Sequence, residues 1–177
     1  KKMSKSRGNV VDPLEIIDEF GADSLRFTLA SMASPGGDMA LARDRLAGYR
    51  TFCNKLWNAS RFVLMNLGNE WETEQAVADA AHPVAANLAD RWILSRFSRL
   101  LPKFEENLGK YRFDEASLDL YHFVWHEFCD WYIEMTKLEL WGTDPEALRS
   151  TRATLVAVLE GSLKVLHPIM PFITEEI

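Results

Sequence analysis

The sequence predicts an all-α fold: an antiparallel helical bundle preceded by a small subdomain of two short helices. Four long segments repeat apolar residues every three or four positions, helix start and stop signals flank them, and strand-like alternation is almost absent. The chain has 177 residues, of which 47% are hydrophobic, so it can bury one substantial core. We place the subdomain at residues 1–41 and the bundle at residues 42–177.

The N-terminal subdomain begins with a loop and continues into two short helices. Residues 1–11 are basic, rich in Ser, Gly and Asn, and lack periodicity, which indicates a loop. A helix with a proline in its first turn is predicted over about 13–20, where Asp12 caps it and Gly21 ends it. A second short helix is predicted over about 22–31.

The bundle itself is predicted from four longer amphipathic helices. Their expected ranges are about 42–67, 86–108, 114–138 and 145–166, and a further element should begin after Ile169. The segment between the first two, residues 68–83, is acidic and weakly periodic, so we expect an exposed connection there.

Two of these helices carry particular expectations. Pro102 lacks a backbone donor and should kink the second helix or end it near Leu100. Asp114 should cap the third helix, which is apolar on two sides and therefore belongs at the centre of the bundle. The residues predicted to form its main inward face are Ala116, Leu120, Val124, Phe128, Trp131, Met135 and Leu138.

The composition argues against several classes of protein. No run of residues approaches the roughly 20 apolar positions that a membrane-spanning helix needs, and no signal peptide is visible, so we expect a cytoplasmic protein. The two cysteines and four histidines lack metal-ligand spacing, so no metal site is expected.

Charge is unevenly distributed along the chain. The formal net charge is −6, but residues 1–67 carry a net charge of +3 and residues 68–177 a net charge of −9. A polyanionic partner should therefore dock on the N-terminal third of the chain.

The motif most suggestive of chemistry is Lys2-Met3-Ser4-Lys5-Ser6, followed by Gly8. Two ammonium groups three residues apart can neutralise a polyphosphate, hydroxyl groups add directional hydrogen bonds, and a glycine allows close backbone approach. From these properties alone, a solvated basic tail and a phosphate-binding loop both remain open.

The string Lys2-Met3-Ser4-Lys5-Ser6 resembles the signature loop of class I aminoacyl-tRNA synthetases. The resemblance implies that Lys2, Ser4, Lys5 and Ser6 bind ATP, and that Lys5 is the catalytic residue that stabilises charge on the phosphates, with Lys2 in support. The implied cofactors of the parent enzyme are ATP and Mg²⁺.

The resemblance extends over essentially the whole chain. Gly21 to Arg26, Asn54 to Asn58 and His167 to Phe172 are similar to the stem-contact and anticodon-binding regions of the valyl, isoleucyl and leucyl enzymes. Thr28 to Gly36 and Asn54 to Leu64 look like the valyl family. The bundle would then be an anticodon-binding domain.

A parent enzyme of the valyl family would activate valine with ATP and transfer it to tRNA(Val), with editing of misactivated threonine elsewhere. The chain starts without an initiator methionine and stops inside a helical pattern, so we expect an excised, C-terminally truncated segment. Because the nucleotide-binding Rossmann domain is not among these residues, we expect the isolated chain to be inactive in ligation. It should be a monomer.

The resemblance also selects residues for tRNA contact on the first long helix. Cationic, amide and aromatic side chains there suit phosphate contact, base-edge hydrogen bonding and stacking. The residues are Arg43, Arg50, Asn54, Lys55, Asn58, Arg61 and Phe62. The alternative is a solvated helix face with Phe62 in the core, whereas Trp57, Trp125, Trp131 and Trp141 are all expected in the core.

Two other hypotheses remain. The same segment could come from an isoleucyl- or leucyl-tRNA synthetase. The net charge of −9 over residues 68–177 instead suggests a helical protein-interaction module without RNA affinity.

Overall fold

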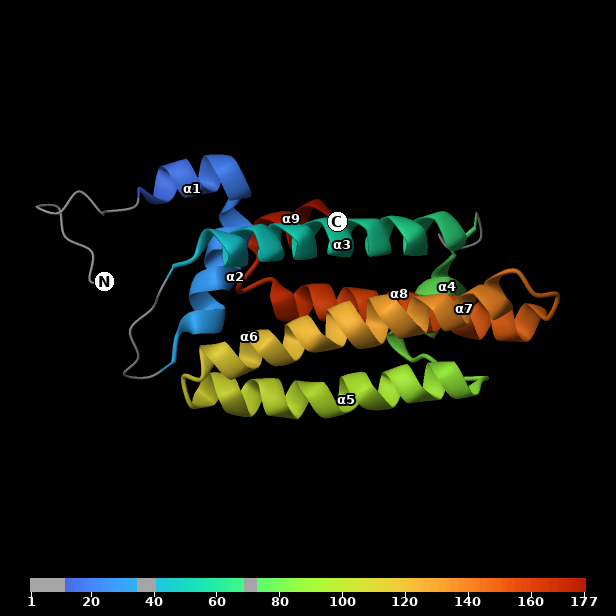
Figure 1. Ribbon diagram of the computed structural model, residues 1–177. Coiled ribbons are helices and arrows are strands. Elements are labelled where there is room, and N and C mark those ends of the chain that lie inside the picture. Colours follow the sequence, from blue (N-terminus) through green and yellow to red (C-terminus); the bar gives the residue numbers. More distant parts are fainter. Residues whose placement is uncertain (1–11, 35–40, 69–72) are drawn as a thin grey trace, which may run out of the picture.

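The computed structural model describes residues 12–34, 41–68 and 73–177, and within these ranges the secondary structure is helical. The elements are α1 (Pro13–Phe20), α2 (Ala22–Met32), α3 (Arg43–Asn66), α4 (Glu74–Ala81), α5 (Leu88–Gly109), α6 (Phe113–His122), η3 (Phe123–Tyr132), α7 (Ile133–Leu140), α8 (Pro145–Leu166) and α9 (Pro171–Glu176). The long helices lie side by side in Figure 1, with α1 and α2 at one end. The predicted all-α bundle is confirmed.

Local sequence signals set most of the helix starts. The Asp12 carboxylate accepts a hydrogen bond from the Leu14 backbone N–H at 2.9 Å, and Asp144 caps α8 in the same way. Gly21 ends α1 at a φ of 89°, a conformation that residues with a side chain rarely adopt. These caps were predicted, because an acidic residue followed by proline satisfies the first free backbone donors of a helix.

Three predictions about helix boundaries were wrong. The predicted connection over 68–83 contains α4, an alanine-rich helix that is capped by the Thr73 side chain and packs against α8. α5 does not end near Leu100 but continues through Pro102 to Gly109, and the kink at Pro102 stays a prediction. Pro102 and Ser98 are both exposed, so water can bind the carbonyl that the proline leaves free. Asp114 does not cap α6, because the helix begins one residue earlier, at Phe113, with Arg112 at the N-cap; the Asp114 carboxylate accepts a hydrogen bond from the Arg112 side chain at 3.3 Å.

Residues 113–140 form one continuous rod that changes its helical winding in the middle. In η3 the backbone follows the π pattern, in which each N–H bonds to the carbonyl five residues earlier; Ile133 N, for example, bonds to Phe128 O. This pattern puts more residues in each turn than the 3.6 of an α-helix. The inward positions therefore drift along the rod relative to the α-helical prediction.

Because of this drift, the predicted inward face is wrong beyond Phe128. Tyr132 and Thr136 are buried, whereas Trp131 and Leu138 are 62% and 80% exposed. Met135 is also exposed. Up to Phe128 the prediction was correct, because the accumulated shift is still small there.

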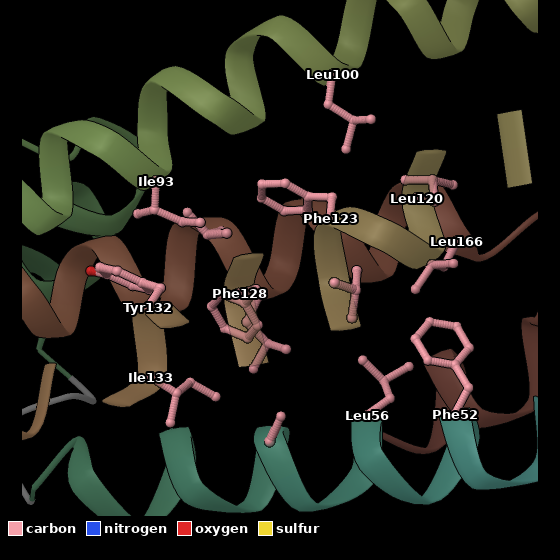
Figure 2. Packing of buried hydrophobic residues seen from close by; sticks show 14 of the residues in the cluster. Phe52, Leu56, Ile93, Leu100, Leu120, Phe123, Phe128, Tyr132, Ile133 and Leu166 are labelled. Atoms are coloured by element: carbon pink, nitrogen blue, oxygen red, sulfur yellow. The ribbon is translucent and has the colours of Figure 1, made fainter. Parts of the chain in front are cut away.

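The core lies between α3, α5, the α6–η3–α7 rod and α8 (Figure 2). Its buried members shown there include Phe52 and Leu56 from α3, Ile93 from α5 and Leu166 from α8. α2 also contributes, because Phe27 is fully buried in this cluster. The boundary near residue 41 stays a prediction, although a separate small cluster of Ile16, Leu25 and Leu46 joins α1 and α2 to α3.

A buried carboxylate joins three helices. Asp90 on α5 has 0% exposure, and its oxygens accept hydrogen bonds from the Tyr132 hydroxyl at 2.7 Å and the Ser150 hydroxyl at 2.9 Å. Asn87 and Thr151 donate further hydrogen bonds to the same carboxylate. Burial and the neighbouring Asp90 charge raise the pKa of Tyr132, so its hydroxyl stays a donor. Without these partners a buried charge would cost several kcal/mol.

A second polar junction, here called the clasp, ties α2 to the turn between α8 and α9 and to the first turn of α9. The clasp consists of hydrogen bonds from Arg26 Nε to Ile169 O (2.9 Å), from Arg26 Nη2 to Pro168 O (2.9 Å), and from Phe172 N (3.3 Å) and Ile173 N (2.7 Å) to the Asp23 carboxylate. Asp23 is buried, and the two sides of the clasp lie more than 140 residues apart in the chain.

Tyr132→Phe tests the Asp90 network. The change removes one hydrogen bond to a buried carboxylate without creating a cavity, so the free energy of unfolding should fall by about 2 kcal/mol. Urea denaturation at neutral pH measures it. Tyr121→Phe is the control, because the Tyr121 hydroxyl has no hydrogen bond to the residues that the structure describes. Equal stability of the two variants would contradict this account of the network.

Replacing either of two glycines on long helices by alanine should change the stability of the fold, in opposite directions at the two positions. A Cβ at Gly161 would lie 2.6 Å from Phe97 Cζ, where α5 meets α8, so Gly161→Ala should destabilise the fold by about 1 kcal/mol or more. A Cβ at Gly48 meets nothing within 4 Å, so Gly48→Ala should stabilise by up to about 1 kcal/mol. Thermal unfolding of both variants measures the difference, and stabilisation by both would refute the close packing at Gly161.

Candidate nucleic-acid interface

α3 carries the charge and the polar side chains that a polyanion would need. It contains five Lys or Arg residues against one Asp. One side of the helix is buried in the core through residues such as Phe52, Leu56 and Val63, which leaves the opposite side to solvent. The helix is thus amphipathic, with a basic outer side.

The structure brings three of the predicted tRNA-contacting residues together on this outer side. Asn54, Asn58 and Arg61 are exposed and follow one another at intervals of four and three, which places them on one helix face. Arg61 makes no ion pair or hydrogen bond to any residue within the described ranges. Its guanidinium is therefore available to a partner.

Arg43 and Arg50 are engaged within the fold instead. Arg43 forms an ion pair with Glu19 of α1 at 2.9 Å, and Arg50 donates a hydrogen bond to the Glu19 backbone carbonyl at 2.9 Å. The Arg50 contact satisfies a carbonyl in the last turn of α1. Both arginines are exposed, and exposed ion pairs contribute at most about 1 kcal/mol, so either could exchange its partner.

Lys55 points to the seam between α3 and η3. Its ammonium pairs with Asp130 and lies 4.2 Å from the centre of the Trp125 ring. Asp130 also contacts His126 Nδ1 at 3.1 Å. Partial burial raises the pKa of Asp130, but the hydrogen bonds from Lys55 and His126 lower it by more, so the net pKa lies below its usual value.

The aromatic residues differ from the sequence-based expectation. Phe62 is half-buried and packs against the main core, so it lies beside the face of Asn54, Asn58 and Arg61 rather than on it. Trp57 was expected in the core but is 45% exposed. The spacing could have shown this, because position 57 precedes Arg61 by four and follows Asn54 by three. We call Asn54, Trp57, Asn58 and Arg61 the open face of α3.

Two other tryptophans were also wrongly expected in the core. Trp131 on η3 and Trp141 after α7 are 62% and 70% exposed, while Trp125 is half-buried as part of the aromatic seam. The predicted ATP-contacting residues Lys2, Ser4, Lys5 and Ser6 lie outside the described residues. Their roles stay predictions.

The described ranges hold no grouping of three or more His, Cys, Asp or Glu side chains suited to a metal ion. In the same ranges no helix is both long and apolar enough to cross a membrane.

Comparison with protein families matches two parts of the chain. Residues 1–42 match the family described as tRNA synthetases class I (I, L, M and V), and residues 90–177 match the family described as Anticodon-binding domain of tRNA ligase. α3 lies between the two matched segments and packs against elements of both.

Curated relatives match the chain from end to end. The chain is 51% identical to the Valine--tRNA ligase of Syntrophotalea carbinolica and 51% identical to that of Geobacter sulfurreducens, covering 100% of the chain in both cases. It spans about a fifth of the length of these relatives, 19% and 20%.

A solved structure shares the fold. The crystal structure of a ternary complex of LeuRS, tRNA and LeuAMS from Agrobacterium radiobacter K84 aligns with a TM-score of 0.73 over 99% of this chain and 20% of that chain, at 19% identity. The low identity supports likeness of fold alone. Taken with the family matches, these results show that the chain belongs to the class I tRNA synthetases. Within that class it belongs to the valine–tRNA ligase family, of which it represents one segment.

The contacts of Asp130 in the seam between α3 and η3 should make the stability of the fold depend on pH. Because the folded pKa of Asp130 is lowered, its contribution is fully present above the unfolded value, about 3.9, and is lost as pH falls through the lower folded value. Asp130→Asn should therefore destabilise at pH 6 and progressively less below pH about 4. Urea denaturation between pH 6 and pH 3 measures this, and a difference that does not shrink with acid would contradict it.

Proposed function

We propose that this chain is the part of a valine–tRNA ligase that binds the anticodon stem-loop of tRNA(Val), and that the open face of α3 makes the contact. The observation that carries the proposal is Arg61, an exposed guanidinium that has no partner within the described residues and is flanked by two exposed amides and an exposed indole. Membership of the valine–tRNA ligase family and the anticodon-binding match of the packed bundle support it.

The open face has the chemical groups that unpaired RNA bases require. Arginine contacts phosphates or stacks on a base, asparagine can bond to base edges, and an exposed tryptophan provides a stacking surface. Phe62 and Lys55, on the neighbouring flank toward η3, could take part at its edge. Arg43 and Arg50 could contribute by exchanging Glu19 for a phosphate.

For the whole ligase we propose that Lys2, Ser4, Lys5 and Ser6 bind the phosphates of ATP, with Mg²⁺ as the accompanying ion. Lys5 would stabilise the negative charge that develops on the departing pyrophosphate as valine attacks the α-phosphorus. The products would be valyl-adenylate and then valyl-tRNA, formed in the cytoplasm by a monomeric enzyme. The likeness of this segment to valine–tRNA ligases at about 50% identity supports valine over leucine or isoleucine.

A protein-interaction module is the second candidate, and one observation favours it. Trp131, Met135 and Leu138 are exposed at helical spacing along η3 and α7, with Trp141 close behind. Such a stripe could pack against another protein surface. Salt separates the two functions, because phosphate contacts weaken steeply with salt whereas apolar contacts do not.

The test is binding of this chain to a stem-loop RNA that carries the valine anticodon, compared with a stem-loop of scrambled anticodon, at low and physiological salt. We expect tighter binding to the valine stem-loop and a loss of about tenfold in affinity for Arg61→Ala or Trp57→Ala, since one contact of this kind contributes about 1–3 kcal/mol.

Arg99→Ala is the matched control, because Arg99 is an exposed arginine on α5 away from the open face. It should bind like the unmodified chain apart from a small change in salt dependence. Equal affinity for both stem-loops, or equal effects of Arg61→Ala and Arg99→Ala, would exclude the open face of α3 as the recognition surface.

A further inference from the structure

The clasp connects the two parts of the chain that match different families. Asp23 and Arg26 belong to the segment that matches class I synthetases, residues 1–42, and their partners belong to the segment that matches the anticodon-binding domain, residues 90–177. Whatever fixes these two segments relative to each other also fixes the bundle relative to the part of the ligase that precedes it.

Apolar packing holds α2 on the bundle but does not by itself fix the orientation of this helix. Phe27 is fully buried among the rings of Tyr49, Phe52 and Tyr121, whose centres lie 4.6–6.4 Å from its own. Hydrophobic burial depends on the area removed from water and is not directional. These contacts alone would therefore tolerate small rotations of α2.

The clasp fixes the orientation of α2 on the bundle. Both of its side chains bond to backbone atoms, so they fix the path of the chain itself rather than the position of another side chain. Charge-assisted hydrogen bonds are short and geometrically demanding. Because Asp23 and Arg26 lie one turn apart on α2, a rotation of that helix would break contacts of both at once.

We propose that Asp23 and Arg26 are positioning residues that set the angle between the bundle and the synthetase segment, so that a tRNA held by its anticodon presents its other end to the catalytic centre. This inference rests on the proposed function. Binding at one end of a ligand raises the effective concentration of its other end only when the geometry allows both sites to be occupied together. The clasp sets that geometry without touching RNA or substrate.

The proposal predicts a selective defect. In the full-length ligase that contains this chain, Arg26→Gln should leave valine-dependent ATP–pyrophosphate exchange without tRNA, and binding of the isolated valine stem-loop, within about twofold of the unmodified enzyme. Aminoacylation of whole tRNA(Val) should lose about tenfold or more in kcat/KM, because only this reaction needs both ends in place. Arg26→Lys keeps the positive charge and can still donate to one of the two carbonyls, so its loss in kcat/KM should be smaller.

Arg96→Gln is the control variant. It breaks the two hydrogen bonds of 2.7 Å between Arg96 and Glu127, which join α5 to η3 inside the bundle, and should change all three measurements by less than about twofold. Where Arg26→Gln gives too little folded protein, Asp23→Asn, which keeps the side-chain volume and one acceptor oxygen, is measured in the same assays with the same expected pattern.

Three results would overturn the proposal: aminoacylation by Arg26→Gln at the unmodified rate, a fall in pyrophosphate exchange of the same size, or loss of stem-loop binding. Stem-loop binding by the unmodified ligase distinguishes failure of the proposed function from failure of the positioning role. If it fails to bind the valine stem-loop, the proposed function of the bundle is wrong. If it binds and the selective defect is absent, only the positioning role is wrong.

Discussion

The packing of the bundle depends on the buried carboxylate of Asp90. Asp90 sits at 0% exposure where α5, η3 and α8 meet, and it is tolerated because hydroxyl and amide groups from those helices surround its two oxygens. Apolar side chains could fill the same volume in several registers, since close packing alone constrains helices less than directed hydrogen bonds. A slip of η3 or α8 by one residue would remove part of these hydrogen bonds from the carboxylate, at a cost of about 1–3 kcal/mol for each buried group left without its partner. The network therefore fixes which residues the rod turns outward.

The π-helical winding of η3 decides what the rod exposes. Along it the buried positions follow an interval of about four residues, which keeps Phe128 and Tyr132 inward and turns Trp131 toward solvent. Asp130 then lies beside Lys55 and completes the seam with α3. A regular α-helix would have carried the apolar stripe inward and altered that seam. One local change of winding thus shapes a surface next to the open face of α3.

The N-terminal segment is held by contacts of a different kind. α1 is tied to α3 through Glu19, and α2 is tied to the α8–α9 turn and the first turn of α9 through the clasp. Two motifs that look unrelated in the sequence, one around Asp23 and one around Pro168, therefore form a single structural unit. Under the positioning role proposed above, such a unit would link recognition by the bundle to the catalytic part of the ligase.

The sequence by itself determined the helical class, most helix starts and the family. Caps such as Asp12 and Asp144 act over two or three residues, and a signature string such as Lys2 to Ser6 is local by definition. Only the tertiary structure decided the π winding, the exposure of Trp131, the engagement of Arg43 and Arg50 by Glu19, and the clasp. These depend on partners tens to more than a hundred residues away, whose approach is set by packing and by the need to satisfy buried polar groups. Helical periodicity describes a helix alone and carries no record of such neighbours.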